Sequence, residues 1–210
     1  MRAALQAQLV PRRPSLCPEL VLELADAPVP LWEALEATTS KQEEPPFWGH
    51  AWPGSLALAR AVLDAPLLVS DRTVLDFATG CGVSAIAAAR SGARSVLATD
   101  IDAHAVRHAL HNAALNGVQL EARCRDVIGV DESWQVVLVG DVFYEDALAR
   151  RVWQWLRQLS SRGAQVLIGD PGRSFLPHAE LECLATYSLE PNPAWDSVTD
   201  RPPRVWKLKT

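Results

Sequence analysis

The first residues that suggest chemistry form a glycine-rich turn between an apolar segment and an alanine-rich segment. Residues 74–77 predict a buried strand, and residues 82–90 predict a helix. Between them, Gly80 and Gly82 would let a ligand approach the backbone, and the start of the helix offers free N–H groups. The spacing of Gly80, Gly82 and Ala85 also fits the dinucleotide fingerprint. The turn therefore indicates a ligand without identifying it, and the alternative is a simple tight turn.

Two aspartates narrow the choice of ligand. Asp76 ends the strand four residues before Gly80, where its carboxylate suits a cationic ammonium and would repel a pyrophosphate. Asp100 closes the next predicted strand, 20 residues after Gly80, where a carboxylate accepts both hydroxyls of a ribose. S-adenosylmethionine has a ribose, an adenine and an amino-acid tail but no phosphate, so it fits both positions. The alternative for Asp100 is an ordinary polar strand end.

The adenine of this cofactor would lie beyond the second strand. We expect Ile101 to pack on the ring. Asp126 and Val127 follow the third strand and would reach the amino group of the adenine. A solvated loop aspartate is the alternative for Asp126.

Strands and helices alternate from residue 73 onward, which defines the fold class. Branched apolar runs predict strands at 74–77, 95–99, 118–123, 135–139 and 165–168, and helices are expected at 82–90, 103–116 and 145–159. A further helix is expected at 178–185, with strands at 186–189 and 204–208. Strands separated by helices pair in parallel through right-handed crossovers. We therefore predict a doubly wound, mostly parallel, seven-stranded Rossmann-like α/β sheet with helices on both faces.

The segment before this alternation is less regular. Residues 1–17 are expected to form a loosely ordered N-terminal arm, and residues 18–210 a single domain. Within that domain we expect an exposed strand at 19–25 and helices at 31–39 and 55–63.

Several segments outside the turn resemble one family. They are residues 46–48 (Pro-Phe-Trp), 52–54 (Trp-Pro-Gly), 138–144 and 167–173. Together with the turn they resemble the electron transfer flavoprotein β-subunit lysine methyltransferases, which belong to the seven-strand class I methyltransferases, and the similarity extends from about residue 18 to 206. Ala78 departs from the pattern, since many members of the class have glycine there. The resemblance implies that Ala78 still forms part of the cofactor turn.

The resemblance also implies an acceptor site beside the cofactor. Asp141 and Tyr144 end the fourth strand, where a carboxylate and a phenol would guide a lysine ammonium and orient its lone pair. Such a lysine must lose its proton, since its ordinary pKa is about 10.4. The alternatives are that Asp141 caps the helix starting at Glu145 and that Tyr144 packs in the core.

Four more residues complete the expected cleft. Trp52 is assigned to the cofactor and Trp48 to the substrate, as aromatic walls that could face a cation. Asp170 and Arg173 end the fifth strand and would touch the substrate chain. Core packing is the alternative for the tryptophans, and a stabilised turn with a surface arginine is the alternative for 170–173.

No metal site is expected. His104, His108 and His111 share one helix face, but no fourth ligand or metalloprotease motif accompanies them. We interpret them as a solvated helix face. The four cysteines are scattered and indicate neither a disulfide nor a metal site.

Composition limits the partners. The formal net charge of −5 argues against sequence-independent binding of nucleic acid, and no apolar run approaches the ~20 residues of a membrane span. We expect a cytoplasmic monomer, or a mitochondrial matrix protein if the source is eukaryotic. The leading hypothesis is a protein lysine N-methyltransferase acting on the electron transfer flavoprotein β subunit. The alternatives are methylation of a nicotinamide-like amine or a ribosomal protein, and a non-catalytic cofactor-binding module.

Overall fold

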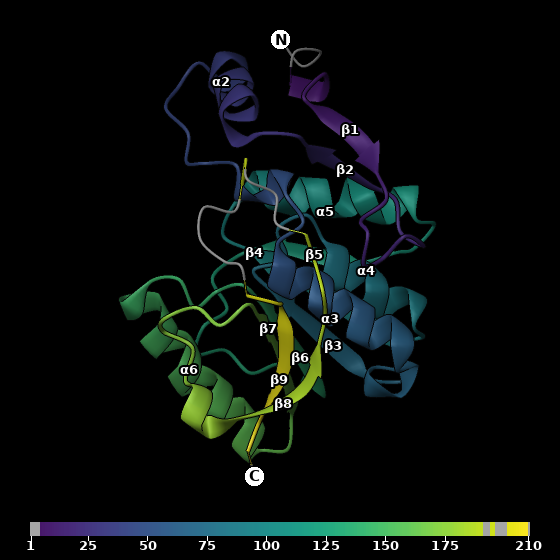
Figure 1. Ribbon diagram of the computed structural model, residues 1–210, viewed down its shortest axis with the longest axis vertical. Helices are drawn as coiled ribbons and strands as arrows, with labels where there is room; N and C mark the ends of the chain where they lie inside the picture. Colours follow the sequence, from purple (N-terminus) through teal and green to yellow (C-terminus); the bar gives the residue numbers. More distant parts are fainter. Residues whose placement is uncertain (1–4, 191–193, 196–200, 210) are drawn as a thin grey trace.

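A seven-stranded sheet forms the centre of the molecule (Figure 1). The computed structural model describes residues 5–190, 194–195 and 201–209. The strands are β3 (Thr73–Phe77), β4 (Ser95–Asp100), β5 (Glu121–Cys124), β6 (Val136–Gly140), β7 (Gln165–Asp170), β8 (Leu181–Thr186) and β9 (Arg204–Leu208). Their order is β5-β4-β3-β6-β7-β9-β8, and only β9 runs antiparallel to its neighbours. The predicted mostly parallel seven-stranded sheet is confirmed.

Helices cover both faces of the sheet, as predicted. One face carries α3 (Pro53–Asp64), α4 (Val83–Arg90) and α5 (Ala103–Leu115), and the other carries α6 (Asp146–Ser161). Within β6, Val136 and Leu138 pack toward α3 and α4, while Val137 and Val139 pack toward α6. Residues 136–139 of β6 are therefore all apolar, because helices bury both faces of the strand. None of the described helices is long and apolar enough to cross a bilayer.

Three glycines allow α3 to lie directly on the sheet. A Cβ atom added at Gly54 would overlap the carbonyl oxygen of Gly169. A Cβ atom added at Gly169 would likewise overlap the carbonyl oxygen of Gly54. A Cβ atom at Gly140 would overlap the hydroxyl of Ser55. The first turn of α3 is consequently fixed against the carboxyl ends of β6 and β7.

The N-terminal segment packs on the sheet domain. β1 (Leu9–Arg12) pairs antiparallel with β2 (Leu22–Ala25), and Cys17 between them is fully buried. Leu22 and Leu24 are also buried, so the strand expected to be exposed is not. Figure 1 shows this hairpin and α2 (Pro28–Thr39) gathered near α5. The described part of the expected arm forms β1, and its Leu9 and Cys17 side chains are buried in the apolar clusters that include residues of α5 and α3, respectively.

The hairpin is also held to the end of α5 by hydrogen bonds from its backbone to two asparagine side chains. The side-chain oxygens of Asn112 and Asn116 accept the N–H groups of Glu23 and Val21 at 2.8 and 2.9 Å. Neither asparagine was singled out from the sequence.

The helix predicted at 178–185 and the strand predicted at 186–189 are both wrong, because the strand lies at Leu181–Thr186 and residues 187–190 have no regular secondary structure. Residues 178–185 were expected to be helical, but they form the short 3₁₀ turn η3 (His178–Glu180) followed by β8. Glu and Leu favour helices, yet β8 pairs along its length with β9, and tertiary pairing outweighs local propensity here. The third strand also starts later than predicted, at Glu121. The remaining short elements are the 3₁₀ turns η1 (Phe47–Gly49) and η2 (Pro66–Leu68).

Candidate active site

The carboxyl ends of the central strands open into a cleft of about 1070 Å³. It lies where the strand order reverses between β3 and β6, which is the usual ligand position in doubly wound sheets. The predicted site residues that line it are Trp48, Trp52, Ala78, Gly80, Asp100, Ile101, Asp126, Asp141, Tyr144 and Arg173. The predicted residues that lie outside its lining are Asp76, Gly82, Val127 and Asp170.

The glycine-rich turn has left-handed backbone at three positions. The φ angles are +53° at Ala78, +52° at Gly80 and +85° at Gly82. Ala78 therefore adopts a conformation that favours glycine. A Cβ atom at Gly80 would meet nothing within 4 Å, so the turn is open to a ligand at this point. Gly82 instead faces Ala109 of α5, where a Cβ atom would lie 2.9 Å from the alanine Cβ.

Asp76 lies behind the turn. It is 3% exposed, and its carboxylate accepts a 2.5 Å hydrogen bond from the hydroxyl of Thr79. Burial raises the pKa of Asp76 to about 7, and the hydrogen bond from Thr79 opposes that shift. Asp76 therefore supports the turn from inside. Thr79, which lines the cleft, was not foreseen from the sequence.

Asp100 lines the cleft, and its carboxylate has hydrogen-bond acceptor positions that remain unused. One carboxylate oxygen accepts the N–H of Gly80 at 3.0 Å, and the other accepts the N–H of Asp102 at 3.0 Å. Burial raises the pKa of Asp100. Because a carboxylate has about four acceptor positions, roughly two remain for the hydroxyls of a ribose.

Of the two apolar residues expected near the adenine, Ile101 lines the cleft but Val127 does not. Ile101 lines the cleft and is 78% exposed, as a residue awaiting an apolar partner would be. Val127 is buried in the core, and the next residue, Ile128, lines the cleft in its place. Asp126 accepts the N–H of Ile128 at 2.9 Å and pairs with Arg151 at 3.1 Å. The loop following a strand has no fixed side-chain period, so the sequence could not distinguish Val127 from Ile128.

Asp141 is the most highly connected carboxylate of the cleft. It accepts the N–H groups of Gly54 and Ser55 at 3.1 and 2.7 Å, and the Ser55 hydroxyl at 3.2 Å. These N–H groups belong to the first turn of α3, whose own N-cap, Trp52, makes no side-chain cap. Asp141 therefore caps α3 across the sheet, and not the helix at Glu145 as the alternative had it.

Tyr144 points away from the core. Asp141 has a φ of +60°, and the following residues Val142 and Phe143 are buried, whereas Tyr144 is 58% exposed and lines the cleft. The alternative of core packing is therefore wrong. Burial, and secondarily the charge of Glu145, raises the pKa of the Tyr144 phenol, so it stays protonated at neutral pH.

Trp48 closes the cleft beside α5. It is 4% exposed, and its indole N–H has no hydrogen-bond partner among the described residues. Its ring lies 6.1 Å from that of His104 and 4.8 Å from that of His108. A buried donor without a partner at the edge of a cleft is available to a ligand acceptor.

The histidine face of α5 is only partly solvated: His111 is exposed and His104 half-buried, but His108 is buried, which corrects the interpretation for that residue. His108 is buried, its Nε2 lies 2.8 Å from the Glu23 carbonyl oxygen, and burial lowers its pKa to about 4. His111 pairs with the Glu23 carboxylate at 2.9 Å. Within the described ranges, no group of three or more His, Cys, Asp or Glu side chains is placed to hold a metal ion.

Both Asp170 and Arg173 were expected to touch the substrate, but only Arg173 lines the cleft. Asp170 is fully buried, and one carboxylate oxygen accepts the N–H groups of Gly172 and Arg173 at 2.6 and 2.7 Å. Burial raises its pKa to about 6. Arg173 reaches the cleft, where its guanidinium donates to Asp141 at 3.0 Å and lies 6.0 Å from the centre of the Trp52 ring.

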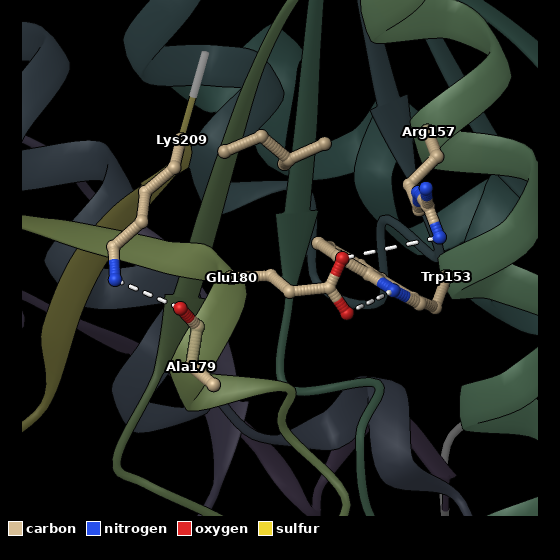
Figure 2. A pocket seen from close by; sticks show the side chains of 6 residues that line it. Trp153, Arg157, Ala179, Glu180 and Lys209 are labelled. Carbon is tan, nitrogen blue, oxygen red and sulfur yellow. Dashed lines mark hydrogen bonds and ion pairs between the residues drawn. The ribbon is translucent and has the colours of Figure 1, made fainter.

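A second hollow lies elsewhere and contains no predicted site residue. It measures about 310 Å³ and lies beside α6 and η3 (Figure 2). There Glu180 accepts the indole N–H of Trp153 at 3.2 Å and lies 3.9 Å from Arg157, while Lys209 donates to the Ala179 carbonyl at 2.8 Å. Its charged groups already have partners, so the larger cleft is the candidate site.

The cleft fits S-adenosylmethionine. Asp100 has free acceptor positions, Ile101 offers an exposed apolar surface, and the backbone at Gly80 is open. These three features match a ribose, an adenine and an amino-acid tail respectively. All three residues line the cleft, Gly80 is hydrogen-bonded to Asp100, and Ile101 follows Asp100 in the chain, so a single extended ligand would contact all of them.

Solved structures share this fold. The chain matches a tRNA uracil methyltransferase of Pyrococcus abyssi with a TM-score of 0.61 at 16% identity, covering 96% of this chain and 44% of that one. It also matches a ribosomal protein L11 methylase of Lactobacillus delbrueckii subsp. bulgaricus with a TM-score of 0.50 at 23% identity, covering 73% and 77%. The fold and the site define a class I S-adenosylmethionine-dependent methyltransferase.

Sequence relatives identify the family. Electron transfer flavoprotein β-subunit lysine methyltransferases of Danio rerio, Xenopus laevis and Homo sapiens are 42%, 39% and 37% identical to the chain. The matches cover 76%, 78% and 83% of this chain and 62%, 70% and 69% of the relatives, so the chain spans about two thirds of their length. A ribosomal protein L11 methyltransferase (PrmA) family model matches residues 57–150. The chain belongs to the electron transfer flavoprotein β-subunit lysine methyltransferase family.

Proposed function

We propose that this protein methylates a lysine side chain of the electron transfer flavoprotein β subunit. The observation that carries the proposal is that both halves of the reaction share one cleft. Asp100 and Ile101 line its cofactor side, while Asp141, Tyr144 and Arg173 line its acceptor side. The names of the relatives support the choice of acceptor.

The shape and charge of the cleft suit a lysine on a protein surface. Tyr144 and Phe47 line the cleft and are 58% and 54% exposed, so the rim is open and partly apolar. Glu44 is exposed and lines the same cleft, where it would attract a cationic side chain from solution, whereas Glu43 is already paired with Lys41 at 3.3 Å. An open cleft with apolar and acidic residues accommodates a flexible lysine with its aliphatic chain.

Each residue has a defined role in this proposal. S-adenosylmethionine, when bound, supplies an electrophilic methyl group. Asp100 holds the ribose end, and Trp52 and Tyr144 confine the lysine side chain so that its nitrogen approaches in line. Ordering the two reactants in this way removes much of the entropic part of the barrier. Asp141 fixes α3, and hence Trp52, relative to the end of β6.

The alternative acceptor, ribosomal protein L11, has weaker support. The L11 methyltransferase family model covers residues 57–150, which form most of the cofactor side. Arg173 on the acceptor side lies outside this match, and so do Trp48 and Trp52. The relatives that extend over both sides carry the flavoprotein name.

The test is methylation with labelled cofactor of three samples: purified flavoprotein β subunit, purified L11 and a cell extract. We expect label on the β subunit, located on a lysine by mass spectrometry and lost when that lysine is changed to arginine. The Asp100→Ala variant serves as a control that binds cofactor poorly. Labelling of L11 or of another extract protein, with an unlabelled β subunit, would overturn the proposal.

We also propose that the protein acts as a monomer, without nucleic acid, in the cytoplasm or the mitochondrial matrix. The net charge of −5 supports the second point. Light scattering, a nucleic-acid gel shift and cell fractionation would test these three points separately.

A further inference from the structure

Arg173 is fixed at the acceptor side by contacts from three directions. Its backbone N–H is held by Asp170, and its guanidinium donates to Asp141 at 3.0 Å. The same guanidinium lies 6.0 Å from the Trp52 ring centre, and its side chain is only 21% exposed. A permanent cation therefore occupies the floor of the site that would receive a lysine.

The carboxylate of Asp141 has no acceptor position left for that lysine. One oxygen accepts from Gly54 and Arg173, and the other accepts from the N–H and the hydroxyl of Ser55. A carboxylate offers about four acceptor positions, and all of them are taken. Asp141 therefore cannot hold an ammonium unless Arg173 is displaced.

Other charged groups also surround the pair, and Asp170 adds a second carboxylate beside Arg173. Asp170 is fully buried, and its second oxygen lies 3.8 Å from Arg173 Nε. The first turn of α3 adds the positive end of its dipole on the far side of Asp141. Burial raises the pKa of the Tyr144 phenol, and the negative charges of Glu145 and Asp100 raise it further, so the phenol is protonated.

We propose that Arg173 selects the neutral amine of the incoming lysine by cancelling the charge of Asp141. The inference rests on the proposed function and deepens it. The lysine gives its proton to bulk water before it enters. Its free lone pair would then attack the sulfonium methyl group, so that the N–C bond forms as the C–S bond breaks and the sulfur of the cofactor keeps the electron pair of that bond. Without Arg173, the bare carboxylate would stabilise the unreactive ammonium and raise the pKa of the acceptor amine.

The test compares Arg173→Gln with Arg173→Lys in the full chain. Turnover is measured from pH 7 to 10 with saturating cofactor and β subunit. In Arg173→Gln we expect the pH midpoint to rise by about one unit, because a neighbouring charge shifts a pKa by that order. Well below the midpoint, turnover then falls about tenfold, and this loss narrows as the pH approaches the raised midpoint, while Arg173→Lys, which keeps the charge, retains the wild-type midpoint.

An equal loss of turnover at every pH in both variants, or no change in either, would overturn the inference. A second measurement needs no acceptor. Carbon-13 NMR of labelled aspartates, with Asp141 assigned through Asp141→Asn, should show that carboxyl titrating at higher pH in Arg173→Gln than in the wild type. Unchanged titration would also overturn the inference. Failure of wild-type labelling of the β subunit concerns only the proposed function, and the pH profiles are then recorded on the acceptor identified in the extract.

Discussion

The two sides of the cleft use buried carboxylates in different ways. On the cofactor side, Asp100 accepts N–H groups from Gly80 and Asp102, which lie 20 and 2 residues away in the chain. On the acceptor side, Asp141 binds Ser55, 86 residues earlier, and Arg173, 32 residues later. The cofactor side is thus a local strand–turn–helix unit, whereas the acceptor side is assembled from three distant segments.

This difference has an energetic consequence. Asp100 keeps free acceptor positions, so its substitution should mainly affect a ligand. Asp141 satisfies the first turn of α3 and the guanidinium of Arg173, so its substitution should disturb both. Substitutions on the two sides should therefore separate cofactor affinity from turnover, and the following predictions test this separation in order of expected effect.

The largest effect is expected for Asp141→Asn. Asparagine keeps the volume but has one acceptor oxygen, so it cannot satisfy both the α3 N–H groups and Arg173. We expect single-turnover methylation to fall by roughly 10²–10³, the usual cost of losing an oriented polar group at a reacting centre. Cofactor affinity, titrated separately, should change by only a few-fold. A near-wild-type rate would show that the acceptor side is not organised by Asp141.

Asp100→Ala should have the complementary effect. Loss of the charged hydrogen bonds to a ribose should weaken S-adenosylmethionine binding by about 1.5–3 kcal/mol. Calorimetry measures this directly, and Glu182→Ala, which removes a carboxylate outside the cleft, is the matched control. Unchanged affinity would mean that Asp100 only holds the N–H groups of its own turn.

Asp76→Asn should change how stability depends on pH. Burial raises the pKa of Asp76 to about 7 in the folded state, above its value in the unfolded chain. Its contribution is fully present below the unfolded pKa and is lost as pH rises through about 7. Between pH 4 and 8, the unfolding free energy of the wild type should fall relative to the variant by on the order of 2 kcal/mol. Urea titrations at several pH values measure this, and parallel curves would contradict it.

Tyr144→Phe should have a mild effect on turnover alone. The ring remains at the rim of the cleft, and only the hydroxyl is lost. One hydrogen bond contributes about 0.5–1.5 kcal/mol, which corresponds to a roughly two- to tenfold slower rate. Cofactor titration should match the wild type. A loss as large as that of Asp141→Asn would assign the phenol a direct part in the reaction.

Treatment with EDTA should have no effect. His108 and His111 are engaged by Glu23 of β2, and the described side chains form no metal-binding group. Activity measured before and after dialysis against EDTA should agree. Loss of activity that zinc or magnesium restores would contradict this prediction.

Local features of the sequence predicted the elements around the cofactor turn, although Asp76, Gly82 and Val127 lie outside the lining of the cleft. The strands and helices around the turn follow from apolar periodicity, and the exposed Ile101 follows from its place after β4. The partners of Asp141 could not be predicted, because the capping of α3 by a residue of another strand leaves no local pattern. The exchange of Val127 for Ile128 has a similar cause, since loop side chains have no fixed period. The β8 error arose because pairing with β9 is also a long-range property.

The close contact between Gly54 and Gly169 limits how this protein could be redesigned. Their backbones touch without side chains between them, so α3 cannot be retilted to suit a bulkier or differently shaped acceptor. Engineering of acceptor specificity should therefore leave these two positions unchanged. Libraries would better target the segment 41–46, whose Glu43 and Glu44 line the cleft and lie outside the rigid sheet. Exchanging the exposed Glu44 for lysine should favour acceptors flanked by aspartate or glutamate.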